Sequence, residues 1–403
     1  KQKTAYEIKE CDWSSDVCSS DLCFPAYRTY VDPGGCSARD AEALGTAIRE
    51  ARRRNPAMES SIFDFLRFVL LPGVPHAEAV ESRDDTAGAR AAIAMRCQQY
   101  TAPVHAKGVE DTAFYRYHAL ISLNEVGADP ARIGRSVSEF HQAAIERQRH
   151  TPGEMLATTT HDTKRSEDAR ARIAVLSEIP DEWQAAVSRW RRMNAPHRTK
   201  GQPGQSPDAN DEYLFYQALL GAWPADALGV APGAAPDAFV ARMQRFMEKA
   251  IKEAKLHTSW ITPNVEYEQA VARFVERTLS GRRAAPFLAS FVPFVQRVAR
   301  AGVTNALAQL VLKLMSPGVP DFYQGTELWD HSLVDPDNRR PVDWALRRRL
   351  LESVVPSAWA ISGRRDSGGE AACERASAML EGWQDGRSEE HTSELQSHSF
   401  ISY

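Results

Sequence analysis

The amino-acid sequence predicts an α/β fold that is mostly helical and contains few strands. Residues 154–160 form a threonine-rich run behind an apolar start, and residues 319–323 form a short run after the chain-breaking sequence Ser-Pro-Gly. Both patterns are typical of short strands. A helical pattern lies beside each run, over residues 166–178 and 303–315. A helix that leads into a buried strand is typical of a βαβ unit, and so few strands among many helices indicate part of an α/β barrel.

Hydrophobic spacing predicts the other elements in chain order. Residues 27–31 are β-prone, residues 61–71 are predicted to form a buried helix, and residues 195–210 are predicted to form a polar loop. Trp183 and Trp190 lie seven positions apart on one apolar helical stripe. Further helices are expected over residues 41–54, 87–100 and 239–254, the last with one apolar face.

The composition is that of an ordinary globular protein. Of 403 residues, 43% are hydrophobic and 25% are charged, and 49 Lys and Arg against 53 Asp and Glu leave a net charge of −4. These values exclude a wholly disordered or collagen-like chain and leave no positive surplus for nucleic acid. No apolar stretch approaches the roughly 20 residues that span a bilayer. Six scattered cysteines form no disulfide framework or zinc pattern, so we expect free thiols and a cytoplasmic location.

Both ends of the chain differ from its middle. Residues 14–23 contain a polar tandem repeat, Ser-Ser-Asp-Val-Cys followed by Ser-Ser-Asp-Leu-Cys, with neither a helical nor a strand period. Residues 1–22 and 387–403 are typical of translated sequencing adapter, and we expect them to be non-native segments. A genuine low-complexity tail is the alternative.

The sharpest polar run, residues 160–165, follows the first predicted strand and precedes a helix. Active sites of α/β barrels lie at such strand ends, which makes His161 and Asp162 candidate site residues. The alternative is structural. The Asp162 carboxylate would then cap a helix that begins near Thr163, and His161 would be a satisfied polar neighbour. The run alone does not decide between the two.

A second run, residues 106–117, is dense in charged and aromatic side chains. Sugars are bound by carboxylates that accept hydroxyl hydrogen bonds, by Lys and Arg that donate them, and by aromatic rings that cover C–H surfaces. This run supplies all three kinds of group. The structural alternative is a helix edge held by an i,i+4 pair of Lys107 and Asp111.

A third run, residues 317–329, leads into residues 333–343, where the chain turns at Asp-Pro-Asp-Asn. Most such runs are only turns. Together, however, the three runs resemble maltooligosyltrehalose synthases, members of the α-amylase family of glycoside hydrolases and transglycosylases. The resemblance covers about residues 23–386. It includes residues 24–31, 124–127, 216–224, 249–255 and 258–260.

The resemblance implies a partial TIM (β/α)8 barrel of the α-amylase type with large, mostly helical insertions. Residues 23–153 would be a barrel remnant with a helical insertion, and residues 346–386 would begin the region after the barrel. Between them, residues 154–345 would hold the last barrel strands, at about 154–162 and 319–325, and an insertion at about 180–300.

The resemblance also implies roles for individual residues. The family uses three acidic residues, and only the third, the transition-state stabiliser, is matched here, by Asp162, with His161 as its hydroxyl-binding companion. Hydroxyl contacts that tighten as the sugar ring flattens lower the barrier by several kcal/mol. No metal or cofactor is implied. The other expected substrate-binding residues are Lys164, Arg165, Lys107, Glu110, Asp111, Tyr115, Arg116, Tyr323, Gln324, Glu327, Asn338 and Arg339.

The reaction implied by the resemblance is intramolecular. The terminal α-1,4 bond at the reducing end of a maltooligosaccharide is cleaved, and the held glucose is rejoined through an α,α-1,1 bond, a step of trehalose biosynthesis. A retaining mechanism needs two carboxyl groups about 5 Å apart, and no motif for this nucleophile and general acid is found. We therefore expect a fragment that is inactive alone, and the family implies functional pairing with a trehalose-releasing hydrolase.

Other functions stay open. The chain could be an α-glucan-binding module without catalysis, another amylase-family glucanotransferase or hydrolase, or a helical scaffold whose polar runs are solvated faces. Turnover of maltohexaose would separate an enzyme from a binding module. An absence of binding heat with maltooligosaccharides would favour the scaffold.

Overall fold

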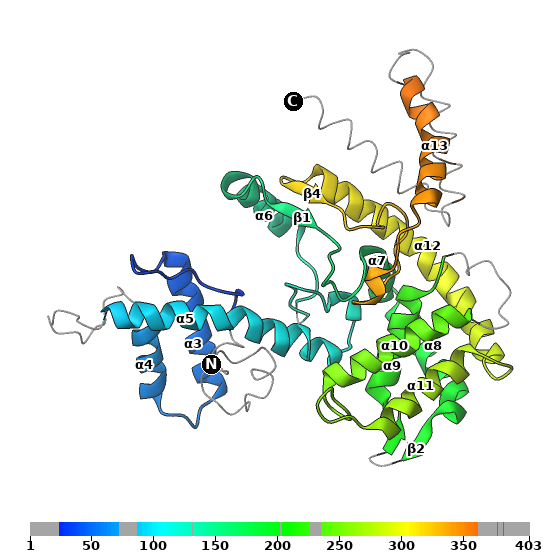
Figure 1. The fold of residues 1–403 in the computed structure, drawn as a ribbon, viewed down its shortest axis with the longest axis horizontal. Coiled ribbons are helices and arrows are strands. Elements are labelled where there is room, and N and C mark those ends of the chain that lie inside the picture. The colour runs from blue at the N-terminus through cyan, green and yellow to red at the C-terminus, as the bar shows by residue number, and fades with distance from the viewer. Residues whose placement is uncertain are drawn as a thin grey trace. The chain divides into compact units, whose positions relative to one another are not determined.

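The computed structural model describes residues 24–71, 87–130, 132–201, 204–225 and 235–361, with residues 377 and 382 (Figure 1). The chain divides after Tyr115 into two compact units. The two predicted non-native segments, residues 1–22 and 387–403, lie outside the described residues.

The described part of the first unit is helical. It contains α3 (Ala38–Arg54), α4 (Ser60–Leu70) and α5 (Ala87–His105), then a π-helical turn (Ala106–Glu110) and a 3-10 turn (Ala113–Tyr115). The three helices predicted in this region are confirmed. The Ser37 hydroxyl caps α3 by accepting the Asp40 backbone N–H at 3.1 Å, which satisfies one of the free amides of the first turn.

The buried helix predicted over residues 61–71 is present as α4, but it is buried on one side only. Phe63, Val69 and Leu70 are buried, whereas Phe65 is 63% exposed. Phe63 packs in a cluster with Ile48 of α3. Because α4 contacts α3 and α5, its remaining side faces solvent despite its apolar sequence.

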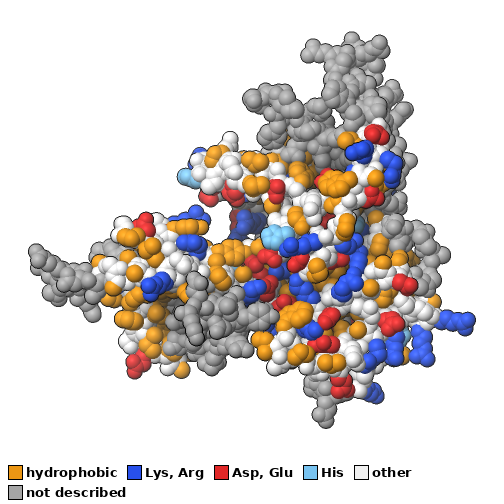
Figure 2. All heavy atoms as spheres, viewed as in Figure 1, with side chains coloured by type: hydrophobic (Ala, Val, Ile, Leu, Met, Phe, Trp, Pro, Cys, Tyr) orange, Lys and Arg blue, Asp and Glu red, His pale blue; other side chains and the backbone are white. Residues whose placement is uncertain are grey.

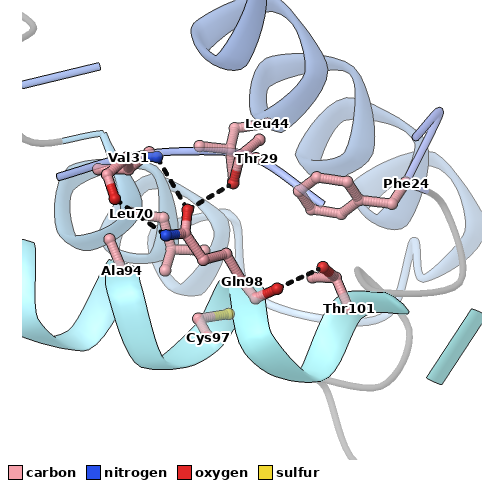
Figure 3. Close-up of a pocket in the computed structure, with 9 residues that line it drawn as sticks. All are labelled: Phe24, Thr29, Val31, Leu44, Leu70, Ala94, Cys97, Gln98 and Thr101. Carbon is pink, nitrogen blue, oxygen red and sulfur yellow. Dashed lines mark hydrogen bonds between the residues drawn. The ribbon is translucent and has the colours of Figure 1, made fainter. Parts of the chain in front are cut away.

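A buried glutamine takes the place of a strand partner in this unit (Figure 3). The Gln98 side-chain amide donates to the Val31 carbonyl and accepts the Val31 N–H, both at 2.9 Å, and it accepts the Thr29 hydroxyl at 3.2 Å. The β-prone run at residues 27–31 is therefore bonded to α5 and forms no strand. The space that these side chains enclose is about 10 Å³, which holds about one water molecule and no larger ligand.

Two strands of the second unit lie at the predicted positions. β1 (Met155–Ala157) and β4 (Val319–Asp321) pair in parallel, with Leu156 opposite Pro320. Gly318, at φ +130°, permits the close approach, because a Cβ there would lie 2.8 Å from the Glu154 carbonyl oxygen. Since the carboxyl ends of parallel strands meet at one edge, the loops after β1 and β4 begin side by side.

Helices make up most of the second unit. β2 (Thr199–Gly201) and β3 (Gly204–Ser206) form an antiparallel hairpin, which corrects the prediction of a loop throughout residues 195–210. The helices are α6 (Val137–His150), α7 (Glu167–Ala174), α8 (Pro180–Asn194), α9 (Ala209–Ala222), α10 (Asp237–Ala254), α11 (Val265–Leu279), α12 (Ala285–Met315) and α13 (Trp344–Ile361). Short 3-10 turns lie at Ile121–Leu123, Val175–Ser177, Ala195–His197 and Asp337–Arg339. The expected partial barrel is not confirmed, because the described ranges contain one parallel strand pair and one hairpin.

The core of the second unit is aromatic. Trp183 and Trp190 of α8 are both buried, as their spacing predicts, and the Trp190 ring centroid lies 5.2 Å from that of Phe291 in α12. Helix α12 also crosses α7 closely at Gly302, where a Cβ would lie 2.9 Å from the Arg172 Cα. This crossing fixes α7 on the helical body, and with it the loop before α7. Among the described helices, none combines the length and apolar character that a membrane span requires.

Candidate functional site

Residues 158–166 join β1 to α7 and are called the β1–α7 loop. His161 and Asp162 lie in the middle of this loop and are exposed. The Asp162 side chain is 58% exposed, and its Oδ1 lies 4.0 Å from the Nζ of Lys164. No described residue donates a hydrogen bond to the Asp162 carboxylate, so this group is available to a ligand.

Asp162 does not cap a helix, so the structural alternative for this residue is wrong. Helix α7 begins at Glu167, and Ser166 occupies its N-cap position. The Asp162 N–H donates to the Thr160 hydroxyl at 3.2 Å, and the Thr163 hydroxyl donates to the Thr160 carbonyl at 2.9 Å. This local turn leaves the carboxylate of Asp162 in solvent.

The carboxylate of Glu125 holds one side of the loop. It accepts the backbone N–H of Lys164 at 2.7 Å and that of Arg165 at 3.3 Å, and the Arg170 guanidinium donates to it at 2.9 Å. The Glu125 and Arg170 side chains are only 13% and 14% exposed, so these charge-assisted bonds are largely shielded from water. No local sequence pattern marks Glu125 as a supporting residue. The one signal for it is its place in residues 124–127, which carry part of the family resemblance.

A buried ion pair holds the start of the loop. The Lys313 ammonium of α12 donates to the Thr158 hydroxyl at 2.7 Å and lies 3.6 Å from the Glu167 carboxylate. The hydroxyls of Thr158 and Thr159 donate to the same carboxylate, and the Glu167 N–H donates to Thr159 Oγ1 at 2.9 Å. A buried pair needs such additional hydrogen bonds to offset its desolvation. The threonine run therefore serves as a set of hydrogen-bonding groups and not, as predicted, as a strand.

A second buried cluster connects α7 with the chain around His331. Arg172 donates to the Trp223 carbonyl at 2.6 Å and to the His331 imidazole. Burial lowers the pKa of Arg172 to about 10, and burial together with the Arg172 charge lowers the pKa of His331 well below its usual value. Burial raises the pKa of the Asp168 carboxyl, which accepts the Asp330 N–H at 2.8 Å. A neutral imidazole is thus a suitable acceptor for Arg172.

Residues 332–340 form a segment that reaches the β1–α7 loop. The buried side-chain amide of Asn338 donates to the His161 carbonyl at 3.0 Å. Asp337 accepts two hydrogen bonds from Arg242 of α10, each at 2.8 Å. Burial opposes ionisation of Asp337, but the Arg242 bonds outweigh it and hold the pKa of that carboxyl below its usual value. Helix α10 is therefore linked to His161 through this segment.

The remaining predicted residues after β1 and β4 lie in different settings. Lys164 and Arg165 are buried, and the Arg165 guanidinium donates to the Ile121 carbonyl at 3.2 Å. Tyr323 is half-buried, and Gln324 is exposed. Only Lys164 among these four is shown close to Asp162, through the 4.0 Å contact of its ammonium.

Three further predicted residues form contacts within the second unit. Glu327 accepts a hydrogen bond from Arg347 of α13 at 2.9 Å, and the half-exposed Arg339 contacts Asp335 at 2.6 Å. Arg116, which is exposed, donates to the carbonyl that ends α10 at 2.6 Å. These contacts fix each side chain without bringing it to Asp162.

Four predicted residues belong to the first unit. Lys107 and Asp111 form the i,i+4 ion pair that the spacing indicates. Glu110 is buried and accepts the Tyr27 hydroxyl, and Tyr115 is also buried. The assignment of these residues to the sugar site stays a prediction.

One group in the described part of the chain has the geometry of a cation site. Asp208, Asp211 and His257 place one ligand atom each within 4.8 Å of one another. The His257 Nε2 lies 2.8 Å from Asp208, and the Tyr267 hydroxyl donates to Asp211. Burial raises the pKa of Asp211 to about 6. These groups satisfy one another, and nothing in their contacts calls for a metal ion.

Comparison with known proteins decides the relationship. No family model matches the chain. The chain is 42% identical over 261 residues to a Mycobacterium tuberculosis protein named maltooligosyl trehalose synthase, an alignment that covers 65% of this chain and 32% of that protein. The structure of this chain matches that of the maltooligosyltrehalose synthase of Arthrobacter ramosus with a TM-score of 0.67 and 32% identity, over 97% of this chain and 44% of that one. The chain is a homologue of one part of maltooligosyltrehalose synthase.

A second solved maltooligosyl trehalose synthase matches with a TM-score of 0.62 and 30% identity, over 96% of this chain and 48% of that one. The resemblance to maltooligosyltrehalose synthases inferred from the three polar runs is therefore confirmed. The chain spans about a third of the Mycobacterium tuberculosis protein and less than half of these solved synthases.

Proposed function

We propose that this chain is the part of a maltooligosyltrehalose synthase that binds a maltooligosaccharide beside Asp162 and stabilises the transition state of glycosyl transfer. One observation carries the proposal: Asp162 is an exposed carboxylate that accepts no hydrogen bond from any described residue, on a loop held by buried polar groups. Glu125, Lys313 and Asn338 each fix a different part of that loop. A binding residue supported in this way keeps its geometry without cost when a ligand arrives.

The chemistry follows from the charge that develops on the sugar. As the anomeric carbon gains positive charge the ring flattens, and a carboxylate that accepts hydrogen bonds from ring hydroxyls binds the flattened ring more strongly than the relaxed one. Asp162 supplies this acceptor. In this proposal the exposed imidazole of His161 contacts a neighbouring hydroxyl of the same sugar. The Lys164 ammonium lies 4.0 Å from the Asp162 carboxylate and favours one orientation of it.

In this proposal β1 and β4 are the last strands of an amylase-type barrel, and the site lies beyond their carboxyl ends. A retaining transfer also needs a nucleophile and a proton donor about 5 Å apart. Within this chain only Asp162 matches an acidic motif of the family. We therefore propose that the chain binds maltooligosaccharides but does not alone convert their reducing-end α-1,4 bond into an α,α-1,1 bond. A trehalose-releasing hydrolase would consume the product of the complete reaction.

Calorimetric titration of the purified chain with maltohexaose tests the proposal. We expect saturable binding, and a dissociation constant about tenfold or more higher in Asp162→Ala, because a hydrogen bond to a charged group contributes about 1.5–3 kcal/mol. The matched control is Asp237→Ala, which removes an exposed carboxylate at the start of α10 and should leave the affinity unchanged. A reducing-end assay run in parallel should show no turnover. Equal affinity of Asp162→Ala and the unmodified chain would overturn the role of Asp162, and loss of reducing ends would overturn the proposed inactivity.

A further inference from the structure

A small pocket lies between α10 and residues 334–340 and is called the α10 basic pocket. Its volume is about 180 Å³. Figure 2 shows Lys and Arg side chains intermingled with Asp and Glu side chains over the region where α7 and α10 lie in Figure 1. The charged lining of the pocket consists of four basic side chains, Arg242, Arg245, Lys249 and Arg340, and two carboxylates, Asp335 and Asp337.

Both carboxylates of the pocket are already neutralised. Asp337 accepts two hydrogen bonds from Arg242, each at 2.8 Å, and a third from the Leu333 N–H at 2.8 Å. Asp335 pairs at 2.6 Å with Arg339, which is not part of the lining. Four basic groups against two occupied carboxylates leave the pocket with excess positive charge.

Arg245 and Arg340 carry this excess. Lys249 donates to the backbone carbonyl of Asp335 at 2.7 Å. Arg340 lies 3.4 Å from the Asp337 carboxylate and donates to the Asp337 carbonyl and to the Ser332 hydroxyl, both at 3.0 Å. Arg245 is exposed and forms no hydrogen bond or ion pair with the residues that the structure describes. Burial, and then the nearby positive charge of Arg242, lower the pKa of Arg340 against the opposing effect of the Asp337 and Asp330 carboxylates.

The size and lining of the pocket limit its occupant. Phe246 and Val334, which are both buried, contribute a small apolar part of the lining beside the basic side chains. The volume of about 180 Å³ is below the roughly 300–1,000 Å³ of pockets for drug-sized ligands. The pocket therefore suits a compact ligand with concentrated negative charge.

We propose that the α10 basic pocket binds a phosphate dianion, either as inorganic phosphate or as the phosphate group of a hexose phosphate. Arg guanidinium groups bind phosphate oxygens through paired N–H donors, and a Lys ammonium adds a compact charge. A neutral sugar would leave the excess charge uncompensated. The proposal does not depend on the role of Asp162.

Calorimetric titration of the full chain at constant ionic strength, with inorganic phosphate, a hexose phosphate and glucose as separate ligands, tests this assignment. Arg245→Ala should raise the phosphate dissociation constant about fivefold or more, and addition of Lys249→Met should raise it further. Arg245 is exposed and bonds to none of the residues that the structure describes, so the single variant should melt like the unmodified chain. The matched control is Arg277→Ala, which removes an exposed guanidinium from α11 and should change the constant less than about twofold.

The ligand series separates the two sources of phosphate. Tighter binding of the hexose phosphate than of inorganic phosphate supports the ester as the natural ligand, and equal binding supports the free ion. The proposal is overturned if glucose binds as tightly as either phosphate, if neither phosphate binds saturably, or if Arg245→Ala leaves both constants unchanged. Titration of Arg245→Ala with maltohexaose should match the unmodified chain, so a failure here is distinguishable from a failure of the glucan site.

Discussion

Replacing Glu125 by alanine should loosen the β1–α7 loop and lower the free energy of unfolding by about 3 kcal/mol. The substitution leaves the N–H groups of Lys164 and Arg165 and the guanidinium of Arg170 without their acceptor. Removing one partner of a buried ion pair costs about 3–5 kcal/mol. The Glu125 and Arg170 side chains keep 13% and 14% exposure, so water enters part of the gap and the lower end of that range applies.

Urea unfolding followed by tryptophan fluorescence measures this loss, and amide hydrogen exchange of residues 158–166 measures the loosening. The matched control is Glu182→Ala, which breaks an ion pair with Arg297 whose side chains are 56% and 61% exposed. Such an exposed pair contributes at most about 1 kcal/mol. Glu125→Gln keeps an acceptor but loses the charge, so its cost should lie between the two.

Equal losses of unfolding free energy in Glu125→Ala and Glu182→Ala would refute this role of Glu125. Unchanged hydrogen exchange in residues 158–166 would refute it independently, because the loop would then be held without the Glu125 carboxylate.

Three further changes test other parts of the structure. Asp211→Asn should raise the free energy of unfolding near pH 8 by up to about 3 kcal/mol and have little effect below about pH 4. Burial raises the folded-state pKa of Asp211 to about 6, so the carboxyl destabilises the fold once it ionises above that value. Equal effects at both pH values in urea unfolding would contradict this. Asn338→Ala should speed amide exchange around His161 and cost about 0.5–1.5 kcal/mol, since the His161 carbonyl loses the hydrogen bond from a buried side chain. Exchange rates equal to those of the unmodified chain would argue against that contact. Gly318→Ala should lower the free energy of unfolding by about 2 kcal/mol or more, because Gly318 has a positive φ and a Cβ there would lie 2.8 Å from a carbonyl oxygen. Gly281→Ala should lower it less, because Gly281 also has a positive φ but its Cβ would meet no atom within 4 Å. Equal melting temperatures of the two variants would exclude the clash.

Local patterns in the sequence predicted the elements whose partners are hydrophobic. The apolar face of α10 and the tryptophan stripe of α8 are buried as their spacing indicates. A helix that is buried on one side carries its hydrophobic residues at a spacing of three to four positions, and this spacing is visible in the sequence. β1 and β4 were identified from short β-prone runs next to helices and pair in parallel. The burial predicted for α4 holds on one side only, since its sequence is also apolar on faces that no described helix covers.

The support of the candidate site could not be predicted in the same way. Glu125 lies 39 positions from Lys164, and Lys313 lies 155 positions from Thr158, so no local pattern connects them. The choice between a helix cap and a free carboxylate at Asp162 depends on the residue at which α7 begins, and propensity does not fix such boundaries. The threonines after β1 have high strand propensity, yet Thr158 and Thr159 form hydrogen bonds to a buried ion pair in place of a strand.

Amide NMR spectra of the labelled chain during titration with maltohexaose test the sugar site most directly. A sugar site at Asp162 predicts chemical-shift changes concentrated at His161, Asp162 and Lys164 that saturate with ligand and are lost in Asp162→Ala. Saturable binding whose shift changes lie entirely outside residues 158–166 would contradict it, as would spectra that do not change at any maltohexaose concentration.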